Sequence, residues 1–242
     1  MAEIQKPDSQ LTAVKWRFPD VHPEGRKFTL IALAATLIAY FGLSHFIGVL
    51  LIGVTIWVAA FFRDPVRTTP QDPRFVVSPA DGMVTMIKRV PAPPELRADM
   101  GEGEFTRVSI FMSVFDVHIN RTPIAGRIRR MAYVPGKFVN ADLDKASEDN
   151  ERQHFLVERE DGTRIAFTQI AGLVARRILA FVREGDQVQA GERIGLIRFG
   201  SRVDVFLPEG TGAKVLLGQR AIAGETILAE LGTDETLRGI AQ

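Results

Sequence analysis

The chain has 242 residues, with 30 Lys and Arg against 29 Asp and Glu. This near-neutral balance excludes the overall basic field that nucleic-acid binding uses, so we expect no nucleic-acid partner. The sequence contains no cysteine, which excludes a disulfide scaffold, a thiolate nucleophile and a zinc site built from cysteines. We expect no metal. The length suits one domain with an appendage, or two small domains.

An uncharged apolar stretch runs over residues 28–62 and follows a polar segment, residues 1–27. It is longer than the roughly 20 apolar residues of a single membrane span, and Gly42-Leu43-Ser44-His45 interrupts it. We therefore predict two apolar helices, 28–41 and 46–62, joined by a tight turn. A buried pair in a soluble core is the alternative, but soluble helices of this length normally carry a polar stripe.

Basic residues flank this stretch on both sides: Arg26 and Lys27 before it, Arg63 and Arg67 after it. Positive residues concentrate on the cytoplasmic side of a membrane. The pattern predicts a hairpin that attaches the protein to the cytoplasmic face of the cell membrane, either crossing it or dipping into one leaflet.

Short apolar runs separated by Gly and Pro fill the remainder, residues 63–242, which we take as one catalytic domain. Alternation of this kind predicts β-strands. The clearest strand-like runs are Phe75–Val77, Val108–Met112, Arg164–Phe167 and Val203–Leu207. We predict a loop over residues 91–103 and a loop or short helix over 140–152, whereas 170–182 fits either a helix or a buried strand.

One internal repeat stands out, because residues 184–194 recur as 217–227 with Gly, Ala-Gly-Glu and Ile at matching places. Each copy reads as a strand, a Gly turn and a strand, which resembles the turns of biotinyl- and lipoyl-type flattened barrels. The entry Pro79-Ala80-Asp81-Gly82-Met83-Val84 fits the same resemblance. The predicted fold class is α+β, mainly β: a flattened β-barrel or sandwich preceded by the apolar helical hairpin.

Gly200-Ser201 lies between the two copies of the repeat. Alone, a Gly-Ser pair is usually only a turn. A serine nucleophile needs a base and a carboxylate that orients the base, and the candidates are His118 and Asp81. Their structural alternatives are a hydrogen-bonded strand histidine and a turn aspartate before Gly82.

Six motifs in chain order carry a resemblance to a known family. They are Phe61-Phe62-Arg63-Asp64-Pro65; Ser78-Pro79-Ala80-Asp81-Gly82; Phe115-Asp116-Val117-His118 through Arg121-Thr122-Pro123; Pro135-Gly136-Lys137 with Asn150-Glu151-Arg152; Gln169-Ile170-Ala171-Gly172 with Ala175-Arg176-Arg177; and Phe199-Gly200-Ser201-Arg202-Val203-Asp204. From Phe61 onward the chain resembles the phosphatidylserine decarboxylases, particularly the short bacterial type.

The resemblance implies that Asp81, His118 and Ser201 form a processing triad. The Gly200-Ser201 bond would then be cleaved autocatalytically into a β chain, 1–200, and an α chain, 201–242. Ser201 would become a pyruvoyl group, the cofactor, which forms a Schiff base with phosphatidylserine and yields phosphatidylethanolamine and carbon dioxide in phospholipid biosynthesis. The implied partners are the membrane lipid and the protein's own cleaved chains, and a homo-oligomer is compatible with the sequence.

Three basic residues, Lys137, Arg176 and Arg177, are candidates for holding the lipid phosphate or the departing carboxylate; the alternative is that they are solvated charges or structural ion pairs. Phe115 stands where longer bacterial members have a histidine, so that histidine's proton-transfer role cannot be carried over. His118 is then the best donor for the carbanion left by decarboxylation. Phe199-Gly200-Ser201-Arg202 likewise replaces a Leu-Gly-Ser-Thr motif.

Two other functions compete with this interpretation. Asp144-Lys145-Ala146 echoes a lipoyl-attachment sequence, which would make the chain a non-enzymatic carrier domain, but polar residues follow it where such a hairpin needs a strand. A membrane-anchored serine hydrolase could use the same triad without cleavage.

Overall fold

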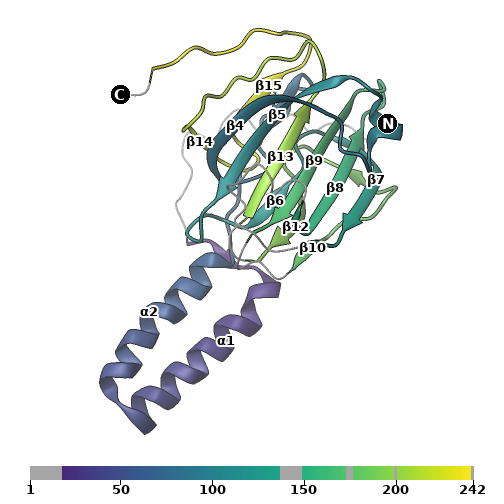
Figure 1. Ribbon diagram of the computed structural model, residues 1–242. Coiled ribbons are helices and arrows are strands. Elements are labelled where there is room, and N and C mark those ends of the chain that lie inside the picture. Colours follow the sequence, from purple (N-terminus) through teal and green to yellow (C-terminus); the bar gives the residue numbers. More distant parts are fainter. Residues whose placement is uncertain (1–17, 137–148, 173–176, 199–200, 241–242) are drawn as a thin grey trace, which may run out of the picture.

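The computed structural model describes residues 18–136, 149–172, 177–198 and 201–240. A body of β-strands forms most of the molecule, and two helices project together from one end of it (Figure 1). Several positions singled out from the sequence lie outside the described residues: Lys137, Lys145, Arg176 and Gly200, with most of the stretch 140–152.

The central element is a strongly curled sheet that forms a half-barrel (Figure 1). Within the described residues it has eight strands, and every neighbouring pair is antiparallel. Their spatial order is β11 (Gln187–Val188), β7 (Gly126–Val134), β8 (Arg152–Glu158), β9 (Arg164–Ala171), β13 (Ser201–Leu207), β5 (Glu104–Met112), β4 (Gly82–Pro91) and β14 (Arg220–Ala221). Hence β13, which begins at Ser201, has a partner on each side.

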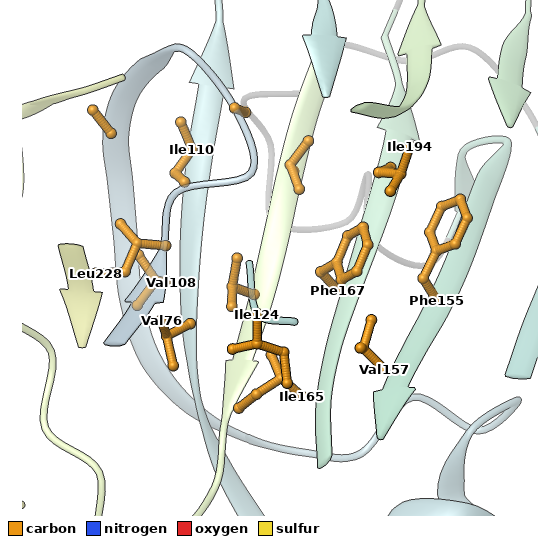
Figure 2. Close-up of a cluster of buried hydrophobic side chains, with 14 of the residues drawn as sticks. Val76, Val108, Ile110, Ile124, Phe155, Val157, Ile165, Phe167, Ile194 and Leu228 are labelled. Carbon is orange, nitrogen blue, oxygen red and sulfur yellow. The ribbon is translucent and has the colours of Figure 1, made fainter. Parts of the chain in front are cut away.

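Two smaller sheets close the concave side of the half-barrel. They are β10 (Ile178–Ala180), β12 (Arg193–Ile197) and β6 (Ile119–Arg121); and β15 (Ile227–Glu230) with β3 (Phe75–Val77). A further pair, β1 (Asp20–Val21) and β2 (Arg63–Asp64), lies at the base of the two helices. The main core lies between these layers, where Val76, Ile124 and Leu228 face the large sheet (Figure 2). Phe155 and Phe167 stack within it, with ring centroids 4.9 Å apart.

Alternation along β13 decides which face of the sheet each of its side chains occupies. Val203, Val205 and Leu207 belong to the main core. Arg202, Asp204 and Phe206 therefore point to the opposite face, where Phe206 packs with Leu96 under the segment that carries the short helix α3 (Arg97–Met100). Ser201 shares the inner face with Val203.

The sequence repeat is a structural repeat. Its first copy contains β11, a turn at Gly191 and the start of β12; its second contains β14, a turn at Gly224 and the start of β15. Both glycines adopt positive φ, 75° and 76°, which side chains disfavour. A Cβ on Gly224 would lie 3.5 Å from the Cα of Gly191, so the two turns meet. The predicted fold class, mainly β with Gly turns of this kind and an apolar hairpin ahead of it, is confirmed.

The hairpin consists of α1 (Pro23–Ile38), a π-helical turn (Ala39–Leu43) and α2 (His45–Phe61). The first helix begins five residues before the predicted 28–41, because Pro23 suits a first helical position and the His22 side chain accepts a hydrogen bond from the Glu24 backbone at 3.2 Å. The uncharged stretch alone did not contain this signal. Within the described residues, 23–43 form one helical run that is long and apolar enough to cross a membrane.

Apolar side chains cover the outside of the hairpin and have no protein layer against them. Those at least 43% exposed include Leu30, Ile31, Leu33, Leu37, Ile38, Phe41, Leu43, Phe46, Ile47, Val49, Leu50, Ile52, Val54 and Ile56. The two helices contact each other through Thr36, whose hydroxyl lies 2.8 Å from that of Thr55. An exposed apolar surface of this extent marks a site of interaction with a membrane or with another protein.

The base of the hairpin is part of the core of the β-body. Phe61 and Phe62 are fully buried and pack with Val117, Ile119 and Leu196. The predicted division at residue 63 therefore cuts through a shared apolar cluster. A truncation there would remove two buried aromatic rings, each worth about 1.5–3 kcal/mol of burial.

Candidate active site

His118 lies in the turn that leads into β6 and is completely buried. Its ring stacks on that of Phe61 with the centroids 4.1 Å apart. Its Nδ1 is 2.9 Å from the carbonyl oxygen of Asp116. A carbonyl oxygen only accepts hydrogen bonds, so Nδ1 carries the proton and Nε2 presents a lone pair.

Burial keeps the imidazole neutral. Loss of solvation lowers the pKa of His118 to about 4, against a smaller raising effect of the hydrogen bond and charge of Asp116. Nε2 is buried and has no hydrogen-bond partner among the described residues. Within the described part of the chain, the Nε2 lone pair of His118 is thus buried in an apolar environment and accepts no hydrogen bond.

Ser201 is the first residue of β13 and is also completely buried. It pairs with Met112 of β5 and with Ala171 of β9. Residues directly opposite in a sheet project to the same face, and Met112 and Ala171 are both inner-face residues. The Ser201 hydroxyl therefore points inward, and it too has no hydrogen-bond partner among the described residues.

The strand connections bring these two residues to one end of the body. The backbone N–H of Ile197, in β12, donates to the carbonyl of His118 at 3.3 Å, and Ser201 follows only four positions later. Hydrogen bonds between side chains also join the strands that carry or adjoin these two residues. Gln169 donates to Asn120 at 2.7 Å, and Asn120 donates to the sulfur of Met112 at 3.4 Å. This end of the sheet is the one from which the hairpin emerges (Figure 1).

Asp81 has partners other than His118. One carboxylate oxygen accepts from Arg67 at 2.7 Å and the other from the backbone N–H of Ala223 at 2.8 Å. Burial raises the pKa of Asp81, and the Arg67 charge opposes that rise. Among the described residues no hydrogen bond joins Asp81 to His118, and the partner of Nδ1 is the Asp116 carbonyl.

The remaining candidates are basic residues. Arg177 is exposed beside β10, where its carbonyl accepts from the backbone of Arg198 at 3.2 Å. Lys137 and Arg176 lie outside the described residues, so the three cannot be placed as one group.

Sequence reasoning missed two groups that shape the site. The Asp116 carboxylate accepts from the backbone and hydroxyl of Ser113 and from Arg220, which fixes the turn before His118. Phe61 supplies the ring under the imidazole. Asp116 and Phe61 both belong to motifs visible in the sequence. Their roles, however, depend on the contacts Phe61–His118 and Asp116–Arg220, whose partners are more than 55 residues apart in the chain. The order of motifs does not reveal such contacts.

Comparison with known proteins adds an independent line of evidence. The family model described as phosphatidylserine decarboxylase matches residues 54–229. Three similar proteins carry the name phosphatidylserine decarboxylase proenzyme. The one from Novosphingobium aromaticivorans is 64% identical, with 94% of this chain and 93% of the relative covered. Those from Erythrobacter litoralis and Zymomonas mobilis are 59% and 57% identical, over 94% and 96% of this chain and 94% and 95% of the relatives.

A mainly β body whose inner end holds a buried serine and a neutral histidine, together with these matches, defines an enzyme of the carboxy-lyase class. More particularly, the chain belongs to the phosphatidylserine decarboxylase family.

Proposed function

We propose that this chain cleaves itself between Gly200 and Ser201 and then decarboxylates phosphatidylserine to phosphatidylethanolamine and carbon dioxide. One observation supports the residue assignment most directly. The Nε2 of His118 and the hydroxyl of Ser201 are both buried without hydrogen-bond partners among the described residues, at the same end of the β-body. Unpaired buried polar groups are costly. Here a basic nitrogen and a hydroxyl of this kind lie at the same end of the body, and this combination supports a role in chemistry.

Cleavage uses the neutral imidazole as a general base. Nε2 of His118 takes the hydroxyl proton of Ser201, and the oxygen attacks the carbonyl carbon of Gly200. The peptide C–N bond breaks as an ester forms, and the proton passes to the released nitrogen. Loss of the Ser201 Cα proton then breaks the Cβ–O bond, leaving residue 200 as a carboxylate and Ser201 as dehydroalanine. Water then hydrolyses the dehydroalanine: its amino nitrogen leaves as ammonia, and the carbonyl oxygen that replaces it completes the pyruvoyl cap on residue 201.

The residues around Ser201 fit such a group. Its position on a strand held on both sides by β5 and β9 keeps the new chain end in register after cleavage. When formed, the pyruvoyl group supplies an α-keto carbonyl that accepts the electrons released as carbon dioxide leaves. Nε2 of the neutral His118 can take a proton from the substrate ammonium as the amine becomes a nucleophile, and it can return that proton to the substrate carbon after carbon dioxide leaves. The surrounding apolar cluster excludes water.

Asp81 acts in this proposal as a positioning residue. Asp81 forms an ion pair with Arg67, which lies in the segment after the hairpin, and it accepts a hydrogen bond from Ala223, which lies in the Gly224 turn of the repeat. Asp81 thereby joins these two parts of the chain. The carbonyl of Asp116 orients the imidazole. Lys137, Arg176 and Arg177 remain the proposed contacts for the lipid phosphate and carboxylate.

The apolar hairpin would place this end of the body at the cytoplasmic face of the cell membrane. His118 stacks on the last residue of α2, so a hairpin inserted in lipid holds the site at the headgroup level. Substrate could then reach the site without leaving the bilayer.

Intact-mass analysis of the purified full-length protein tests the proposed function. We expect two chains, 1–200 and a pyruvoyl-capped 201–242, and conversion of phosphatidylserine in vesicles or detergent micelles. An uncleaved chain that still decarboxylates would refute the mechanism, and an uncleaved chain that reacts with a fluorophosphonate would favour a serine hydrolase.

Shortening the hairpin tests its role as a membrane anchor. Replacing residues 34–56 with a short Gly-Ser linker keeps Phe28, Phe61 and Phe62, whose packing belongs to the body. We expect this variant to cleave itself normally but to stay in the supernatant when vesicles are sedimented, because it lacks most of the exposed apolar surface. Full-length protein should sediment with the vesicles. Sedimentation of the shortened variant in high salt would disprove the anchor assignment.

A further inference from the structure

Phe115 is an exposed aromatic residue held at the tip of a rigid turn between β5 and β6. Phe115 is 72% exposed, although Met112 and Val117, on either side of the turn, are buried. The turn is closed by the Asp116 carboxylate, which accepts from both the backbone and the hydroxyl of Ser113 at 2.8 and 2.7 Å. The ring is therefore presented outward by a fixed backbone and packs in none of the core clusters formed by the described residues.

The turn is tied directly to the end of the hairpin. One guanidinium nitrogen of Arg63 donates to the carbonyl of Phe115 at 2.8 Å, and the other donates to the carbonyl of Ala60, in the last turn of α2, at 2.7 Å. A single side chain thus separates Phe115 from the point where the helix leaves the body. Any membrane that covers the hairpin down to its base meets Phe115 there.

The dimensions of the hairpin support that depth. The 17 residues of α2 span about 26 Å, less than the roughly 30 Å of a bilayer core. To cover its apolar length, the hairpin must enter until its base lies in the interfacial region. Aromatic rings favour that region. Arg63, whose partners here are neutral backbone carbonyls, also places a positive charge beside the turn, where it suits lipid phosphates.

We propose that Phe115 inserts into the membrane interface as a separate lipid contact, outside the two helices, and so fixes the orientation of the body above the bilayer. The same turn supplies the Asp116 carbonyl that orients His118. Insertion would bring the His118 end of the body against the headgroups of the lipid phase. The benefit of this contact for catalysis rests on the proposed function. The contact itself is tested by membrane binding, which needs no enzymatic activity.

The direct test places a fluorescent reporter at the tip. In a background with Trp16→Phe and Trp57→Phe, which removes both native tryptophans, Phe115→Trp is compared with Glu209→Trp. Glu209 is an 80% exposed side chain just past the far end of β13. With vesicles containing phosphatidylserine and brominated phosphatidylcholine, we expect quenching and a blue shift at position 115 and neither at 209.

Affinity gives a second readout. Phe115→Ser should weaken sedimentation with vesicles about tenfold, and Phe115→Leu should largely restore it. Self-cleavage should be unchanged in both, and turnover of detergent-solubilised lipid should fall less than turnover of vesicle lipid. A chain that fails to cleave or decarboxylate would refute the proposed function. The quenching result at position 115 would still report whether the ring enters the membrane, because it does not depend on activity.

Two results would overturn the inference. One is an unquenched tryptophan at 115 while the protein is bound to vesicles, with Phe115→Ser binding as tightly as the unaltered chain. The other is a blue shift at 115 that occurs without vesicles and grows with protein concentration, since that would assign the ring to a contact with a second copy.

Discussion

Ser201→Ala should remain a single intact chain without decarboxylase activity. The substitution removes the only oxygen that could attack the carbonyl of Gly200 in the proposed mechanism, and it also removes the atoms from which the pyruvoyl group would form. Cleavage should be undetectable by intact mass. The fold should survive, because alanine fits the space of a buried serine whose hydroxyl has no hydrogen-bond partner among the described residues.

Ser109→Ala is a matched control on the neighbouring strand. Ser109 is likewise completely buried, its hydroxyl likewise lacks a hydrogen-bond partner among the described residues, and it pairs directly with Asp204 of β13. It lies on the opposite face of the sheet from Ser201. We expect Ser109→Ala to be cleaved and active. Cleavage of Ser201→Ala, or loss of cleavage in Ser109→Ala, would contradict the assignment of the inner-face serine.

His118→Ala should slow self-cleavage by about 10⁴-fold or more, because no base then accepts the hydroxyl proton. The matched control is His154→Ala. His154 is also buried, and burial likewise lowers its pKa to about 4, but it lies on β8 with its Nδ1 2.8 Å from the Thr168 hydroxyl, on the outer face. That control should still be cleaved. Asp81→Asn should give an intermediate rate, since it weakens the tie to Arg67 without removing the base.

The two roles of His118 can be separated after cleavage. Unaltered enzyme that has already cleaved itself can be denatured, and its pyruvoyl-capped 201–242 chain can be refolded with a separately expressed 1–200 chain that carries His118→Ala, with an unaltered 1–200 chain as the control. This exchange removes the imidazole after the cap has formed. If His118 holds the proton for the substrate carbon, decarboxylation should then fall as well, with circular dichroism showing an unchanged fold. Unchanged decarboxylation would restrict His118 to processing, and normal cleavage in His118→Ala would remove it from the mechanism.

The sequence alone determined the elements whose signals are local. The 28–62 stretch carries no charge, and two helices follow from it; Gly191 and Gly224 occupy equivalent places in the repeat, and both adopt the left-handed conformation expected of a Gly turn. Strand existence also followed from alternation, as at β13. Residues 170–182, which periodicity left undecided, contain the end of β9 and all of β10, because a buried strand and a buried helix share the same apolar composition.

Motif order also indicated Ser201, His118 and Asp81 as the residues for chemistry, through family resemblance. Only the tertiary structure decided what surrounds each of them. It places the carbonyl of Asp116 on His118, Arg67 on Asp81 and the ring of Phe61 under the imidazole. These contacts depend on which face each strand turns inward and on how the hairpin base packs, and a sequence pattern carries neither.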